Sequence, residues 1–105
     1  MKNLPEHYSK FIEAYPEVGL AYKALGEAAS GAGPLDKKTV SLIKLGMAIA
    51  SAQEGATHSH TRKSIEAGAT PEEIRHAVLQ AVTTLGFPSM MRGLAWVDDV
   101  LTNLP

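Results

Sequence analysis

The fold is decided by residues 53–88, which read QEGATHSHTRKSIEAGATPEEIRHAVLQAVTTLGFP. This stretch holds three of the four histidines of the chain and a helix–stop–helix signal. Gly68 is typical of the position that follows a helix. Thr70 then suits an N-cap, Pro71 suits the first helical position, and Glu73 completes a capping box. Two helices joined by a short turn are therefore predicted.

The rest of the chain also has the apolar spacing of helices. Six helices are expected, over about residues 4–15, 17–29, 37–53, 56–67, 71–85 and 89–101. No segment shows the sustained alternation that marks a strand, and only 6% of the residues are aromatic. The predicted fold is all-α, with one domain spanning residues 1–105.

The helix expected from Lys37 to Gln53 is apolar on two sides. Its stripes are Val40, Ile43, Met47 and Ala50 on one side, and Leu42, Leu45, Ile49 and Ala52 on the other. A helix with two apolar stripes has to be buried on both. Because a chain of 105 residues has little interior to spare, a second copy is the expected cover. A homo-oligomer is therefore predicted.

Charge and composition exclude several classes of protein. Ten Lys and Arg stand against 11 Asp and Glu, so no basic surface for nucleic acid or anionic lipid is expected. The absence of cysteine excludes disulfides, thiolate metal sites and thiol chemistry. The start of the chain lacks the apolar run of a signal peptide, and no segment reaches the length of a membrane span. A cytoplasmic location without membrane partners is expected.

Two closely spaced histidines raise the question of a metal site. His58 and His60 point roughly 200° apart on a regular helix, so they cannot bind one ion together. Glu54 and His58 share a helix face, but the sequence shows no third ligand. No metal site is predicted within one chain. A site that gathers Glu54, His58 and His60 from symmetry-related chains stays open as an alternative.

His60 is the candidate for proton transfer, because a neutral imidazole can both accept and donate a proton near pH 7. The alternative is a structural histidine bonded to a nearby carbonyl. Lys44 stands among apolar neighbours in the middle of a predicted helix. It can extend its charge to solvent or bind a substrate carboxylate.

The ordered set of His60, Gly68, residues 70–74 and Gly86-Phe87-Pro88 resembles the carboxymuconolactone decarboxylase family, which includes the alkylhydroperoxidase D-like proteins. Together with the long helix before it, this resemblance covers about residues 35–100. It implies an alkylhydroperoxidase D-like helical domain that assembles into trimers or hexamers.

The peroxidase-like members of that family carry Cys-x-x-Cys ahead of the histidine and a glutamate one long helix earlier. Counted back from His60, the two cysteine positions fall on Gln53 and Ala56, and the glutamate position falls on Ser41. Only the histidine is retained. The thiol peroxidase mechanism of the family therefore cannot operate in this chain.

Members similar to the decarboxylase itself lack the cysteine pair and carry out cofactor-free lyase chemistry on a small lactone acid. The resemblance implies that His60 serves as general acid or base. The residues expected to orient or neutralise a carboxylated substrate are Ser41, Lys44, Gln53 and His58. The predicted function is that of a cofactor-independent lyase or isomerase.

Two departures leave the substrate open. Thr84 stands where many members have an aromatic residue, and no arginine pair for a dicarboxylate is evident. The alternative function is a non-catalytic binding or scaffold protein that kept the helical oligomer and lost peroxidase activity.

Overall fold

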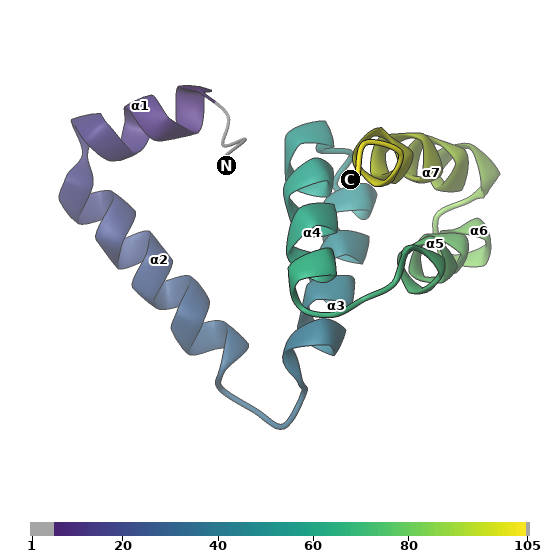
Figure 1. The fold of residues 1–105 in the computed structure, drawn as a ribbon, viewed down its shortest axis with the longest axis horizontal. Coiled ribbons are helices and arrows are strands. Elements are labelled where there is room, and N and C mark those ends of the chain that lie inside the picture. Colours follow the sequence, from purple (N-terminus) through teal and green to yellow (C-terminus); the bar gives the residue numbers. More distant parts are fainter. Residues whose placement is uncertain (1–5, 105) are drawn as a thin grey trace. The chain divides into compact units, whose positions relative to one another are not determined.

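The computed structural model describes residues 6–104, which contain helices and no strand (Figure 1). The helices are α1 (Glu6–Ala14), α2 (Pro16–Ser30), α3 (Lys37–Ala50), α4 (Glu54–Glu66), α5 (Pro71–Leu79), α6 (Ala81–Thr84) and α7 (Phe87–Leu101). Because α6 is a single turn, six longer helices remain, and the all-α prediction is confirmed. The predicted start of the first helix at Leu4 and Pro5 lies outside the described residues. No helix within residues 6–104 is both long and apolar enough to cross a bilayer.

Several helix bounds differ from the prediction, and at two of them the backbone conformation gives the reason. Helix α3 ends at Ala50, because Ala52 adopts a left-handed backbone with φ 57°. Helix α7 begins at Phe87, directly after Gly86 with φ 105°, and places Pro88 in its first turn. A proline is tolerated there because the first helical N–H groups have no partner within the helix. Gly86, which was predicted only to end the preceding helix, is therefore also the N-cap of α7.

The restart between α4 and α5 has the predicted chemistry. The Thr70 hydroxyl accepts a hydrogen bond from the Glu73 N–H at 3.0 Å, and the Glu73 carboxylate accepts one from the Thr70 N–H at 2.9 Å. Gly68 adopts φ 100° ahead of it. The capping box therefore satisfies two amide groups that a helix start otherwise leaves unpaired.

The described helices divide into two compact units, one ending at Pro34 and the other starting at Leu35. In the first, α1 and α2 meet where Gly19 lies against Ile12, and a Cβ at Gly19 would come within 2.5 Å of the Ile12 Cδ1 atom. Gly19 is the one buried residue of α1 and α2. The prediction of one domain over the whole chain stays a prediction.

The second unit has a hydrophobic core between α3, α5 and α7. Its buried members are Leu45, Ile49, Ala69, Ile74, Val78, Val97 and Leu101. Gly93 lets α7 lie close to the other two helices, since a Cβ there would stand 3.1 Å from both Ile49 and Val78. This core fixes the helices that carry the candidate site.

Helix α4 packs beside α3 and against α7 (Figure 1). It carries a stripe of small hydroxyl residues. Thr57, Thr61 and Ser64 are fully buried. Each hydroxyl donates to the carbonyl one turn earlier, at 2.8, 2.7 and 2.7 Å. The stripe is therefore polar in composition but has its hydrogen bonds satisfied.

The two apolar stripes of α3 have different surroundings. Leu45 and Ile49 belong to the core, whereas Ile43 is 42% exposed and Met47 is 62% exposed. Within the second unit, the stripe that contains Ile43 and Met47 therefore lacks the cover that a helix with two apolar sides needs.

Candidate functional site

His60 lies on α4, on one flank of the buried hydroxyl stripe. The ring is partly buried, and its Nδ1 atom is fully enclosed without a hydrogen-bond partner among the described residues. Burial lowers the pKa of His60, and the ammonium groups of Lys63 and Lys44 lower it further. The imidazole is therefore neutral near pH 7, the form that can accept a proton.

Lys44 is the predicted substrate-binding residue that the structure places near His60. It comes from α3 and acts on the imidazole through its charge. Ser41 is also partly buried and lies one turn earlier on the same side of α3. Gln53 is the exposed N-cap of α4 and, seven residues before His60, lies on the same side of that helix.

His58 lies on the other flank of the stripe. Its Nε2 atom is 2.9 Å from Asp99 Oδ2 on α7 and 4.0 Å from Glu54 Oε2 on α4. Helix α4 is regular across both histidines, so the expected divergence of about 200° applies. The structure therefore does not bring His58 and His60 together.

Asp99 was missed by the sequence reasoning. It is 41 residues from His58, and it follows Asp98 in a helix whose pattern shows only an exposed acidic pair. Asp98 instead bonds to Arg75 on α5 at 3.0 Å. Asp98 therefore pairs with α5 and Asp99 with α4. The spacing of residues along α7 does not predict which carboxylate contacts which helix.

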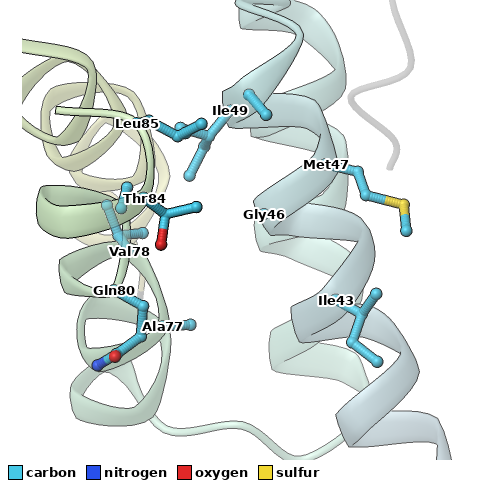
Figure 2. Close-up of a pocket in the computed structure, with 11 residues that line it drawn as sticks. Ile43, Gly46, Met47, Ile49, Ala77, Val78, Gln80, Thr84 and Leu85 are labelled. Carbon is cyan, nitrogen blue, oxygen red and sulfur yellow. The ribbon is translucent and has the colours of Figure 1, made fainter.

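A pocket of about 300 Å³ lies elsewhere in the second unit, with α3 on one side and α5 and α6 on the other (Figure 2). It is lined by Ile43, Gly46, Met47, Ile49, Ala50, Ala77, Val78, Gln80, Ala81, Thr84 and Leu85. None of the predicted site residues is among them. The sequence signal for this pocket is the α3 stripe that contains Ile43, Met47 and Ala50. The sequence pattern predicts an oligomer contact for this stripe rather than a cavity wall.

Comparison with known proteins agrees with this architecture. The model of the carboxymuconolactone decarboxylase family matches residues 16–99. The chain is similar to a carboxymuconolactone decarboxylase family protein from Legionella pneumophila, whose crystal structure was solved in the apo form. The TM-score is 0.80 and the identity 30%, over 91% of this chain and 86% of the other. No match was found among curated proteins.

Proposed function

Because the chain belongs to the carboxymuconolactone decarboxylase family, we propose that it is a cofactor-independent lyase or isomerase for a small carboxylated organic molecule. His60 acts as the general acid or base. The chain has no cysteine, so the proton-transfer branch of the family is a better model for it than the thiol peroxidases.

The observation that carries this proposal is the state of the His60 ring. A structural histidine normally uses a ring nitrogen to hold a neighbouring carbonyl or carboxylate. The enclosed Nδ1 of His60 has no such partner within residues 6–104. An imidazole that no structural hydrogen bond holds in one tautomer supports a role in proton exchange with a bound molecule at the other ring nitrogen, Nε2.

Lys44 supplies the charge that a carboxylated substrate needs. Its ammonium group acts electrostatically on the His60 ring, so a carboxylate held by Lys44 would lie close to the imidazole. Ser41 and Gln53 are proposed to orient the substrate from the two helices. His58 is left out of this proposal, because it contacts Asp99 on the opposite flank of α4.

We further propose that the protein is a cytoplasmic homo-oligomer. Ile43 and Met47 leave an exposed apolar surface on α3, and they border the pocket between α3 and α5–α6. Apolar surface of this kind is stabilised when another copy covers it. The trimers or hexamers implied by the family resemblance are the expected assemblies.

The test is a panel of small lactone acids and enol acids, followed by ultraviolet absorbance. The wild type is expected to turn over at least one member, and His60→Gln is expected to lose that turnover while keeping the same oligomeric mass. Lys44→Met should mainly raise KM, because it removes charge that binds the substrate in the ground state. Normal turnover by His60→Gln would contradict the proposed role.

The second candidate is a binding or scaffold protein without catalysis. The observation that favours it is the pocket bordered by Ile43 and Met47, whose lining is mostly apolar and which includes no predicted catalytic residue. In that case, protein-observed NMR would show ligands or partner peptides perturbing α3, α5 and α6, with no response at His60.

A further inference from the structure

Three side chains with metal-binding atoms meet where the first half of α4 lies against the last turns of α7. Glu54 and His58 are one turn apart on α4, and Asp99 reaches them from α7. The Nε2 atom of His58 is 2.9 Å from Asp99 Oδ2 and 4.0 Å from Glu54 Oε2. One ligand atom from each side chain lies within 4.8 Å of the other two.

We propose that Glu54, His58 and Asp99 form a binding site for a divalent transition-metal ion, with Zn²⁺ as the probe. An imidazole nitrogen with two carboxylate oxygens is a donor set suited to zinc, and three protein ligands leave one position for water. This site lies on the flank of α4 away from His60, so it is separate from the proposed proton-transfer site.

The spacing of the donors fits the size of such an ion. Tetrahedral coordination with bonds of about 2.0–2.1 Å places neighbouring ligand atoms about 3.3 Å apart. The distances from His58 Nε2 to the Asp99 and Glu54 oxygens, 2.9 and 4.0 Å, lie on either side of that value. The Glu54 and Asp99 side chains are 58% and 55% exposed, so they have room to change rotamer around a bound ion.

Among the described residues, the two carboxylates of the cluster, Glu54 and Asp99, share a single partner, the His58 ring. Two carboxylates approach one Nε2 atom, and a single N–H proton can be donated fully to only one of them. Within residues 6–104, the ion pairs of Glu54 and Asp99 are both with His58. Lys38 bonds to Glu73 and Arg75 bonds to Asp98, so neither of these cations neutralises the cluster. A bound cation would satisfy both carboxylates and the imidazole together.

The sequence reasoning stopped at two ligands because the third is distant in the chain. Glu54 and His58 have the helical spacing of a ligand pair, and Asp99 becomes visible only once α7 is packed beside α4. The proposed site is made by one chain and does not use His60, unlike the interchain alternative.

The test is zinc binding to the purified, untagged full chain after removal of metal with a chelator. Competition with a chromophoric chelator, or calorimetry, should give one Zn²⁺ per chain. His58→Gln and Asp99→Asn should each weaken binding by at least about tenfold, since even outer-shell changes cost that much. Cobalt substitution should give visible bands that are lost in His58→Gln.

The matched control is His60→Gln, which alters a histidine two residues away on the same helix. It should bind zinc as the wild type does, and its effect on turnover is a separate readout. Far-ultraviolet circular dichroism should show that all three variants are folded. The proposal is overturned if the wild type binds zinc no more tightly than His58→Gln, or if His60→Gln weakens binding equally.

Discussion

The Nε2 atom of His58 on α4 lies 2.9 Å from the Oδ2 atom of Asp99 on α7, although 41 residues separate them in the sequence. This contact joins two helices of the second unit at a partly exposed position. His58 and His60, although two residues apart on α4, therefore have different neighbours. His58 contacts a carboxylate, whereas burial and the charges of Lys63 on α4 and Lys44 on α3 lower the pKa of His60.

The stability of the His58–Asp99 pair is the first prediction. Their side chains are 25% and 55% exposed, so solvent screens the interaction. We expect Asp99→Asn to lower the free energy of unfolding by no more than about 1 kcal/mol, measured by urea denaturation with a chelator present. A loss above about 3 kcal/mol would instead show that the contact is essential to the fold.

The second prediction concerns acid pH and the capping box. The pKa of Glu73 is lowered first by its bond to the Thr70 amide and then by Lys38. A lowered pKa in the folded state means that the contribution to stability is full above the unfolded pKa of the carboxyl. It is lost as pH falls through the lower, folded pKa.

Glu73→Gln should therefore be less stable than the wild type near neutral pH, and the difference should shrink on acidification. Urea denaturation at a series of pH values measures it. The control is Glu72→Gln on the same helix, an exposed residue with no ion pair among those found in residues 6–104. A Glu73→Gln effect that is constant from neutral to acid pH would contradict this explanation.

Packing of α7 gives the third prediction. Gly93→Ala puts a Cβ 3.1 Å from the Ile49 and Val78 side chains, and both belong to the core. We expect a loss of about 1–3 kcal/mol in the free energy of unfolding from overpacking. Gly55→Ala, with no atom within 4 Å of its Cβ, should be neutral or stabilising by up to about 1 kcal/mol.

The exposed stripe of α3 gives the fourth prediction. Met47→Glu places a charge on the apolar surface that a second copy is proposed to cover, so the solution mass should fall toward 11.2 kDa, the mass of one chain. Sedimentation at several protein concentrations measures it, with Glu66→Gln on exposed α4 surface as the control. A monomeric wild type, or an oligomer unchanged by Met47→Glu, would contradict the proposed assembly.

Local chemistry made most of the fold predictable. Thr70, Pro71 and Glu73 specify a helix start through contacts within four residues, and the structure has that capping box. The end of α3 was harder to place, because Ala52 adopts positive φ without the glycine that normally signals it. Gln80 likewise separates α5 from α6 without a breaker residue.

The candidate site was less predictable, since it depends on contacts between distant helices. Helical periodicity correctly predicted that the His58 and His60 side chains point in different directions. It did not predict which residues of other helices lie near each ring. Asp99 contacts His58 through the packing of α7 against α4, and the charge of Lys44 on α3 lowers the pKa of His60.

The central claim is that His60 transfers a proton, and turnover by matched variants tests it most directly. The wild type, His60→Gln and the exposed-histidine control His76→Gln would be compared on the panel of lactone and enol acids at equal oligomeric mass. We predict turnover by the wild type and His76→Gln, and a loss of at least about 100-fold in kcat for His60→Gln. Equal kcat in His60→Gln and the wild type would contradict the account.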